Sequence, residues 1–578
     1  MAPRPGTFGS SFSGAANALL GRAGRLPLVD VALMVGIVAA GVGVVGLAER
    51  WAAPYHAAVE IDLSLSALPR YALLSLSRGL AAYLLSLVFT ILYGGWAARD
   101  PLAERVLVPL LDVLQSIPVL GFMPALVLAL VGAFPGTNVG LELAAIVMIF
   151  TGQAWNMAFS FYQSVKSVPP VLGEVASVLR FGPLRRLRWL ELPYATIGLV
   201  WNSMMSMAGG WFFLMVSEAF VLGDRDFRLP GLGSYMSVAV ARGDGKAMVG
   251  SVVAMTALIV LLDQLLWRPL VVWAQRFRME ESGQTEEMTS WFYDLLRRSR
   301  LGEAVRSRRR AAFVRPARPP PAGVAAQART SRVASVAVFT LLLALLVWGG
   351  AEVVRLMSGV SLPTWMGLLG DAGLTLLRVL AAVALGTAWT LPAGLAIGLS
   401  PRLSRLLQPV VQVVASFPAP MLFPAVVVVL HAAGVSLGIG SVVLMLLGTQ
   451  WYVLFNVVAG ATAIPADLRE AAELFRFGRW QRFRQLHLPS VFPYLLTGWV
   501  TAAGGAWNAS IVSEYVATGG ETLAAHGLGA TISRQATAGR FPELAAAVLV
   551  MAVVVVGFNR LVWRRLHAVG EERFSSVR

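Results

Sequence analysis

Apolar runs long enough to cross a bilayer recur throughout this chain of 578 residues. A transmembrane helix needs about 20 mostly apolar residues, and charged residues make up only 13% of the chain, against roughly 25% in a typical soluble protein. We therefore predict an all-α polytopic membrane protein with about twelve spans. The expected spans lie near 31–48, 72–97, 106–133, 141–165, 194–222 and 247–273, and near 333–350, 372–399, 408–430, 437–460, 490–516 and 542–562.

Clusters of arginine predict which side of the membrane each connection faces, because cytoplasmic loops carry an excess of Lys and Arg. Four clusters stand out, and twelve spans would place all of them on the side of the N-terminus. Both termini are therefore expected in the cytoplasm, and the net charge of +16 requires no nucleic-acid partner. The clusters are Arg180, Arg185, Arg186 and Arg188; Arg476, Arg479, Arg482 and Arg484; eleven Arg between 297 and 332; and Arg564, Arg565, Arg573 and Arg578.

The two sets of six spans are copies of one another. Leu172 to Pro193 reads LGEVASVLRFGPLRRLRWLELP, and Leu468 to Pro489 reads LREAAELFRFGRWQRFRQLHLP, at an offset of 296 residues. Because six is an even number, both copies face the same way and form a parallel repeat. The predicted organisation is a cytoplasmic N-terminus (1–30), a first repeat (31–275, with a loop at 166–193), an Arg- and Pro-rich cytoplasmic linker (276–332), a second repeat (333–565, with a loop at 462–489) and a cytoplasmic tail (566–578).

Upstream of the duplicated loop the offset between the copies is 300 residues, as for Arg78 and Arg378. The third span of each copy contains two prolines, which remove a backbone donor and should kink or break the helix. These prolines are Pro118, Pro124, Pro418 and Pro424.

The duplicated loop has the same internal order in both copies: Glu with small residues, then Arg-Phe-Gly, a basic stretch and Leu-Pro. Gly182 and Gly478 are expected to end a short helix or form a turn, and Pro193 and Pro489 suit the first turn of the next span. The pattern indicates a short helix at the cytoplasmic surface. The alternative is a basic loop that only anchors the next span to anionic lipid.

The loop resembles the EAA motif of binding-protein-dependent ABC importer permeases. The second copy matches throughout, whereas the first has Val175 in place of Ala. The QSIP-VLGFMPAL and ASFP-APMLFPAV stretches and a Ser-Glu pair after each fifth span resemble the nitrate/sulfonate/taurine branch, over roughly 72–275 and 372–565. With two copies in one chain, the protein is similar to the duplicated permeases grouped as anion transporters. The resemblance implies two six-helix repeats of the type I importer permease fold.

The resemblance also implies partners and roles. Each EAA helix would dock on one of two ABC ATPase subunits, which would bind ATP and Mg²⁺ and drive alternating access in a bacterial inner membrane. A periplasmic binding protein is a further possible partner, and the substrate class would be a small anion such as nitrate, a sulfonate, taurine or bicarbonate. The implied coupling residues are Glu174, Ala176, Arg180, Gly182, Glu470, Ala472, Arg476 and Gly478.

The chain itself is not expected to be an enzyme. It has no G-x-x-x-x-G-K-[ST] sequence to hold nucleotide phosphates, and it has no cysteine for a thiolate metal site. We therefore predict no cofactor and no metal bound by this chain. The two loops differ at Pro183 against Arg479 and at Glu191 against His487. We therefore expect them to bind the two ATPase subunits with unequal affinity.

Candidates for the substrate path come from polar residues within the spans, because an ionisable group in lipid is expensive and suggests function. Each acidic residue could instead form a structural clamp with the matching Arg, and the Trp residues could serve in packing or at the lipid interface. Glu142 has no counterpart and is expected at the interface, at an outer span end. The candidates are Arg78, Arg378, Glu218, Glu514, Trp211, Trp507, Asn202 and Asn508.

Two other functions fit parts of the pattern. A secondary transporter driven by an ion gradient would account for twelve spans and a parallel repeat, but not for two EAA blocks. A structural membrane protein would give no reason for proline-broken spans and Arg–Glu pairs in both copies.

Overall fold

The computed structural model describes residues 59–222, 225–277, 290–298, 332–518 and 521–566. This part of the chain is helical apart from two short antiparallel β-hairpins, one in each repeat. The prediction of an all-α polytopic architecture built from two repeats is confirmed. The first predicted span, 31–48, and most of the predicted linker and tail lie outside the described residues.

The first repeat consists of long helices interrupted by short irregular turns. Its elements are η1 (Leu65–Ala67), α3 (Leu68–Phe89), η2 (Thr90–Gly94), α4 (Gly95–Arg99), α5 (Pro101–Ser116), α6 (Val119–Ala133), α7 (Val139–Lys166), α8 (Pro170–Val178), α9 (Pro183–Arg186), η3 (Leu187–Glu191), α10 (Leu192–Ser217), β1 (Ala219–Leu222), β2 (Arg225–Arg228), α11 (Leu232–Ala241), α12 (Gly245–Leu262), η4 (Asp263–Trp267), α13 (Arg268–Ala274) and η5 (Gln275–Phe277).

The second repeat follows the same order after α14 (Trp291–Arg298), which lies in the predicted linker. Its elements are α16 (Arg332–Met357), α17 (Leu362–Leu399), α18 (Pro401–Ser416), η6 (Ala419–Leu422), α19 (Phe423–Ala432), α20 (Leu437–Thr462), α21 (Ala466–Leu474), α22 (Arg479–Arg482), η7 (Phe483–His487), α23 (Leu488–Ser513), β3 (Tyr515–Thr518), β4 (Glu521–Ala524), α24 (Leu528–Thr537), α25 (Phe541–Phe558) and η8 (Asn559–Trp563).

Matching local signals start the same helix in both repeats. The Asp100 carboxylate accepts hydrogen bonds from the backbone N–H groups of Leu102 and Ala103 at the start of α5. The Ser400 hydroxyl accepts one from Leu403 at the start of α18. A proline follows each cap, at a helix position where the missing N–H costs nothing. The sequence therefore fixes these two helix starts locally.

The third span of each repeat is broken, as its prolines predicted. Ile117 and Phe417 precede Pro118 and Pro418 and adopt extended backbone conformations, since a following proline disfavours the helical region. In the second repeat the two pieces, α18 and η6 with α19, are bent by 78°. The pieces on either side of the break contact the fifth span of the other repeat: α6 packs against α23, and α18 and η6 pack against α10.

Seven helices in the described part of the chain are long and apolar enough to cross a membrane, or eight if the bent pair counts as one span. The predicted runs 106–133, 333–350 and 490–516 are also mostly helical, the first of them broken between α5 and α6, but they fall outside that count. The total of twelve therefore stays a prediction.

Close helix crossings hold each repeat together. The helix α7 packs on α3 and α10, and α20 packs in the same way on α17 and α23. A Cβ atom added at Gly94 would come within 2.9 Å of the Ala158 carbonyl oxygen, and one at Gly394 within 2.6 Å of the Val457 side chain. Small residues at such crossings let two backbones approach closely.

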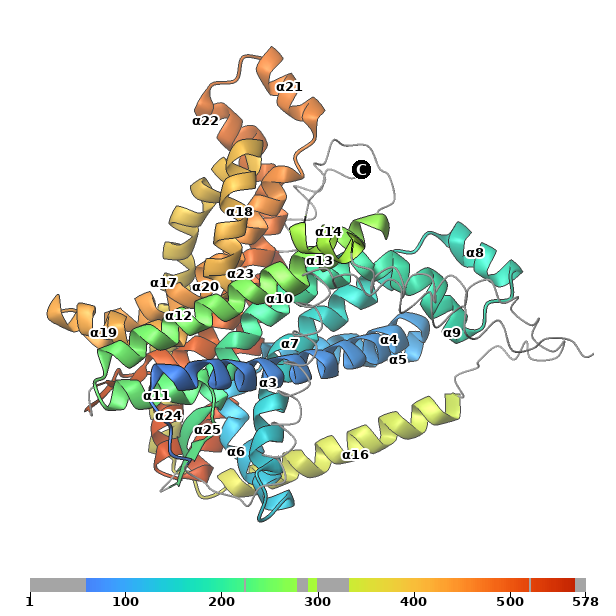
Figure 1. Ribbon diagram of the computed structural model, residues 1–578. Helices are drawn as coiled ribbons and strands as arrows, with labels where there is room; N and C mark the ends of the chain where they lie inside the picture. Colours follow the sequence, from blue (N-terminus) through green and yellow to red (C-terminus); the bar gives the residue numbers. More distant parts are fainter. Residues whose placement is uncertain (1–58, 223–224, 278–289, 299–331, 519–520, 567–578) are drawn as a thin grey trace, which may run out of the picture.

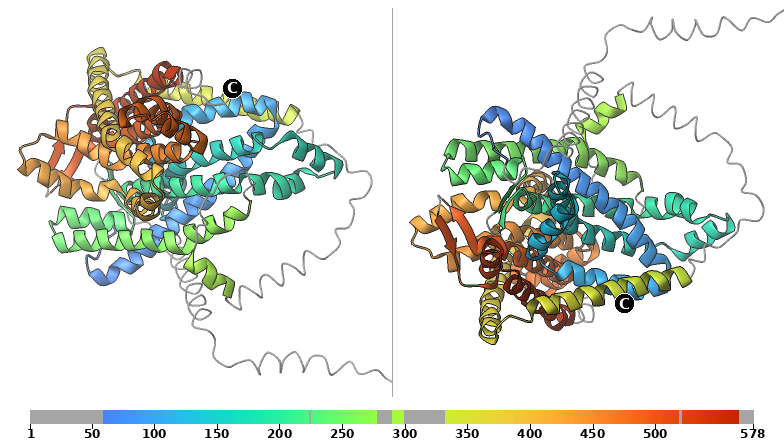
Figure 2. Two further views of the ribbon diagram at one scale, coloured as in Figure 1. Left: turned by 90° about the horizontal axis from the view of Figure 1, so that it is seen from above. Right: turned by 90° about the horizontal axis from the view of Figure 1, so that it is seen from below.

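The two repeats run in different directions from a shared region (Figure 1). Helices α3, α7 and α12 lie across the view, whereas α17, α18 and α20 rise toward its top. The loops containing α8–α9 and α21–α22 lie at the far ends of the two repeats, and the view from above in Figure 2 also separates them. The repeats therefore spread apart toward these loops.

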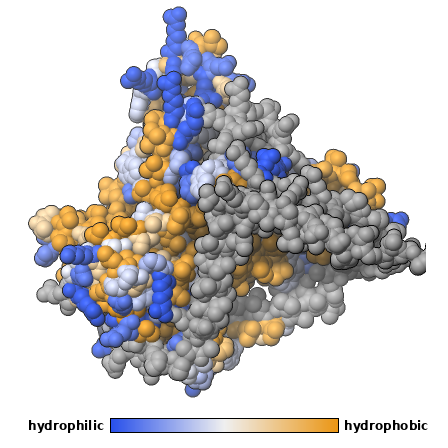
Figure 3. Space-filling view, in the orientation of Figure 1, coloured by the Kyte–Doolittle hydropathy of each residue, from blue (hydrophilic) through white to orange (hydrophobic). Residues whose placement is uncertain are grey.

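Hydrophobic residues cover much of the described helical surface. Figure 3 shows them over much of the face that is not grey, whereas the tip that carries α21 and α22 has both hydrophilic and hydrophobic residues. Large apolar side chains are exposed on α12 and α17, among them Val249 (64%) and Leu377 (65%). A lipid-facing surface of this kind is expected of a spanning protein.

Candidate coupling loops, ion-pair clusters and cavity

The duplicated loop forms the same three-part structure in each repeat. A nine-residue helix, α8 or α21, is followed by a sharp turn and then by a second short helix, α9 or α22. The helix beginning at Pro183 continues without interruption to Ser217. Pro193 therefore lies inside a longer helix than the sequence predicted. The widened turns Leu187–Glu191 and Phe483–His487 end two residues before Pro193 and Pro489, and such a turn accommodates the missing backbone donor of the proline.

The turn between the short helices is made by arginine, not by glycine. Arg180 and Arg476 each have φ of +52°, in the left-handed region. The N–H of the following Phe bonds back to the Ala176 or Ala472 carbonyl at 2.9 or 3.0 Å, the pattern that caps many helices. A left-handed conformation costs a non-glycine residue about 1–2 kcal/mol. The expectation that Gly182 and Gly478 form the turn is therefore wrong.

Gly182 and Gly478 instead begin the second short helices with ordinary backbone angles, φ of −68° and −66°. A Cβ at Gly182 would meet nothing within 4 Å, and one at Gly478 only the Gln481 side chain at 3.8 Å. The described part of the chain therefore gives neither position a steric reason to be glycine.

The short helices present apolar side chains to the outside. Ala176 and Ala472 are buried at 4% exposure, whereas Glu174 and Glu470 are exposed. We call the exposed apolar side chains beside them the loop patches, one in each repeat. At equivalent positions these are Val178 (81% exposed) and Leu474 (83%), Leu179 (58%) and Phe475 (75%), and Leu184 (77%) and Trp480 (69%).

The two loops are attached to their repeats differently. In the first, the carboxylate of Glu191, 1% exposed, pairs with Arg99 from α4 and with Arg186, the latter at 3.1 Å. In the second, His487 replaces Glu191, and Arg482 lies 3.9 Å from Glu473 and donates to the Phe477 carbonyl at 3.0 Å. The sequence revealed the difference at position 191 but not the contact with Arg99.

At the other end of the first repeat, Arg78 is fully buried between two carboxylates. Its Nε lies 2.6 Å from Glu142 Oε2, and its Nη1 lies 2.8 Å from Glu218 Oε1. Glu218 also accepts hydrogen bonds from the Ser75 hydroxyl and the Gly233 N–H, both at 2.7 Å. Glu142 lies in the first turn of α7, at a span end as expected, but it is 1% exposed, and the sequence did not predict its contact with Arg78.

The second repeat has the same cluster with one carboxylate fewer. Arg378 Nη1 lies 2.8 Å from Glu514 Oε1, and its Nε donates to the Gly438 carbonyl at 2.9 Å. Counted by the offset of 296 that relates Trp155 to Trp451, Gly438 stands at the position equivalent to Glu142. Glu514 also accepts from the Thr375 hydroxyl and from the Gly529 and Ala530 N–H groups. Each Arg–Glu pair thus joins elements of a single repeat.

A cavity of about 750 Å³, including its open part, lies between the repeats. Its walls come from α10 of the first repeat and from α18, η6, α20 and α23 of the second. Asn508 lines this cavity, and Trp211 lines a smaller one of about 290 Å³. The lining residues of the large cavity are Met205, Ala208, Gly209, Phe212, Phe213, Gln412, Ala415, Phe417, Pro418, Ala419, Gly448, Thr449, Trp451, Tyr452, Phe455, Gly505, Asn508 and Ala509.

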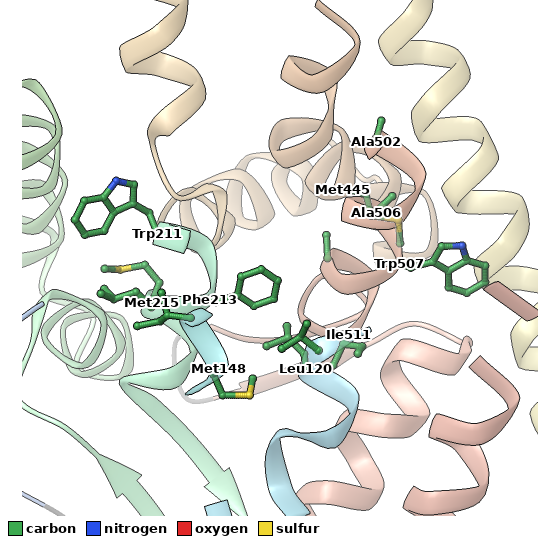
Figure 4. Packing of buried hydrophobic residues seen from close by; sticks show 14 of the residues in the cluster. Leu120, Met148, Trp211, Phe213, Met215, Met445, Ala502, Ala506, Trp507 and Ile511 are labelled. Atoms are coloured by element: carbon green, nitrogen blue, oxygen red, sulfur yellow. The ribbon is translucent and has the colours of Figure 1, made fainter. Parts of the chain in front are cut away.

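The other path candidates lie outside these two cavities. Asn202 donates to Ser160 Oγ at 2.8 Å and to the Gly198 carbonyl at 2.9 Å. Trp507 is 2% exposed, and Figure 4 shows Trp211 and Trp507 pointing to opposite sides, with Phe213 in the space between the repeats. Arg78, Arg378, Glu218 and Glu514 line neither cavity.

Comparison with known proteins identifies the family. The model described as "Binding-protein-dependent transport system inner membrane component" matches residues 71–266 and 386–567, well over half of the chain and once in each repeat. The chain belongs to this family. It is a duplicated permease and a multi-pass membrane protein.

Similar curated proteins are transport permeases. The permease is 27% identical to a nitrate import permease of Synechococcus elongatus, over 26% of this chain and 53% of that protein. It is 25% identical to a bicarbonate transport permease of the same organism, over 26% and 54%. It is 26% identical to a taurine transport permease of Escherichia coli, over 39% and 83%. The chain spans about half the length of the nitrate and bicarbonate permeases that it matches.

The geometry limits the chemistry of the permease. No group of three or more His, Asp or Glu residues that could hold a metal ion occurs in the described ranges. The buried Arg78–Glu142–Glu218 and Arg378–Glu514 clusters form ion pairs within themselves and hydrogen bonds with backbone groups. The exposed loop patches and the cavity are both accessible to a partner or solute.

Proposed function

We propose that this permease is the membrane subunit of an ATP-driven importer for a small solute that carries an oxyanion group, such as nitrate, a sulfonate, taurine or bicarbonate. A partner ATPase hydrolyses ATP, and one ATPase subunit binds each duplicated loop. The substrate class follows the relatives. Both termini and both loops face the cytoplasm, and a binding protein delivers the solute from the opposite side.

The two loop patches are the observation that carries this proposal. Large apolar side chains that are 58–83% exposed on short surface helices are typical of a protein-binding surface. Because the patches lie on loops that the repeats hold apart (Figure 1), drawing the two loops together would move one repeat against the other. Rigid movement of this kind gives alternating access around a site between the repeats.

The open space at Gly182 and Gly478 supports a partner that approaches the backbone closely. We expect Gly478→Leu to fold normally and to weaken capture of the ATPase by at least about tenfold, equivalent to about 1.4 kcal/mol. The measurement is co-purification of the ATPase with tagged permease in mild detergent. Gly350→Leu is the control, because a Cβ at Gly350 of α16 also meets nothing within 4 Å. Undiminished capture by Gly478→Leu would contradict the proposed contact.

The different attachment of the two loops predicts unequal effects of mirrored lesions. The first loop is tied to α4 through Glu191 and Arg99, so it has less freedom to adjust to a changed contact. We expect Glu174→Arg to reduce transport roughly twofold to fivefold more than Glu470→Arg, the range of one surface ion pair. Initial uptake rates at equal expression test this expectation, and equal losses would refute it.

A further inference from the structure

The large cavity between the repeats has aromatic walls and no charge. Six of its lining side chains are aromatic, and within the described ranges no Asp, Glu, Lys, Arg or His lines it. Figure 4 shows Phe213 of α10 turned toward the helices of the second repeat. The aromatic residues are Phe212, Phe213, Phe417, Trp451, Tyr452 and Phe455.

Most polar groups in this cavity already have partners. The Thr449 hydroxyl donates to the Met445 carbonyl and the Trp451 indole to the Leu447 carbonyl, both at 2.9 Å. Asn508 accepts from the Val119 N–H at 2.7 Å and donates to the Gly504 carbonyl at 3.1 Å. In the described structure the Gln412 amide and the Tyr452 hydroxyl have no such partner, and both are only partly buried. These two groups are therefore available to a solute.

A cavity with aromatic walls and no positive charge binds a bare inorganic anion poorly. Moving an uncompensated charge from water into an apolar site is costly, and the faces of aromatic rings carry partial negative charge. The same faces attract a cationic group by about 0.5–2 kcal/mol. An acidic group could accept hydrogen bonds from Gln412 and Tyr452 if the molecule also carried its own compensating cation.

We propose that the solute passing through this cavity is a small organic zwitterion without net charge, such as an aminosulfonate, with its cationic end against the aromatic walls and its acidic end at Gln412 and Tyr452. This inference rests on the proposed function, because it takes the space between the repeats as the transport path. It narrows the range of solutes suggested by the relatives and excludes nitrate and bicarbonate.

The two hydrogen-bonding side chains of the site belong to the second repeat only, because Gln412 lies on α18 and Tyr452 on α20. Counted by the offset that relates Trp155 to Trp451, the position equivalent to Tyr452 is Asn156, and the position equivalent to Asn508 is Phe212. Asn156 lines neither cavity. The duplication therefore does not repeat Tyr452 in the first half of the chain, and Asn156 provides a matched control.

The test is uptake of labelled taurine, nitrate and bicarbonate by vesicles that hold the permease with its ATPase and binding protein. We expect ATP-dependent uptake of taurine alone. Tyr452→Phe and Gln412→Leu should each raise the KM for taurine roughly twofold to tenfold, the range of one hydrogen bond, while Asn156→Ala leaves it unchanged. Gln412→Lys adds a cation to the cavity and should reduce taurine uptake while allowing nitrate uptake.

The outcomes separate this inference from the proposed function. ATP-dependent uptake of nitrate or bicarbonate without taurine would overturn the zwitterion and leave the importer intact. A KM for taurine that is unchanged in both Tyr452→Phe and Gln412→Leu would overturn the assigned site. Uptake of any of the three solutes without ATP would overturn the proposed function, and the inference with it.

Discussion

Replacing Arg78 with leucine is expected to lower the unfolding temperature of this permease more than replacing Arg378. The Arg78→Leu change leaves two carboxylates, Glu142 and Glu218, buried without their cation. Removing one partner of a buried ion pair typically costs about 3–5 kcal/mol. Arg378→Leu leaves only Glu514, which keeps hydrogen bonds from Thr375 and two backbone N–H groups. The Arg378 side chain is also 13% exposed.

Thermal unfolding of the purified permease in detergent measures this difference. A second variant makes the test specific: Glu142→Gln added to Arg78→Leu should recover part of the lost stability, because it removes one of the two unpaired charges. Glu142→Gln alone should be mildly destabilising, since a neutral amide still bonds to Arg78. Equal losses for Arg78→Leu and Arg378→Leu, or no recovery in the double variant, would show that the extra carboxylate has no energetic role.

Introducing a charge into both loop patches is expected to abolish transport without unfolding the permease. Val178 and Leu474 are 81% and 83% exposed, so aspartate at either position buries no charge within this chain. In a complex, however, each aspartate would enter an apolar contact with the ATPase, where an unpaired buried charge is costly. We expect Val178→Asp and Leu474→Asp each to reduce ATPase capture at least about tenfold, about 1.4 kcal/mol, and the double variant to transport nothing.

Co-purification and ATP-driven uptake by reconstituted vesicles are the two measurements. Leu362→Asp is the matched control, because Leu362 is 72% exposed and an acidic residue suits the first turn of α17. Normal unfolding temperatures for all variants would separate lost coupling from lost structure. Uptake by the double variant at the unmodified rate would contradict the docking model, and an ion-gradient-driven transporter would then account better for the repeat.

Local patterns predicted the parts of the fold that depend on nearby residues. Pro118 and Pro418 break the third spans because each restricts the residue directly before it. The copied sequences at Leu172–Pro193 and Leu468–Pro489 fold into the same short helices because the Arg-Phe-Gly and Leu-Pro positions and the hydrogen bonds that close the first helix recur in both. The glycine prediction was wrong within this same loop. There the hydrogen bonds that close α8 and α21 place the left-handed residue two positions before the glycine, at Arg180 and Arg476.

The sequence alone determined that this chain is a duplicated, membrane-spanning protein with two basic surface loops, because length, hydropathy and repetition are properties of continuous segments. Only the tertiary structure decided that Glu142 reaches Arg78, that Glu191 ties the first loop to Arg99, and that an uncharged aromatic cavity lies between α10 and the second repeat. These contacts join residues far apart in the chain. Their partners are therefore set by how the helices pack, which no local pattern records.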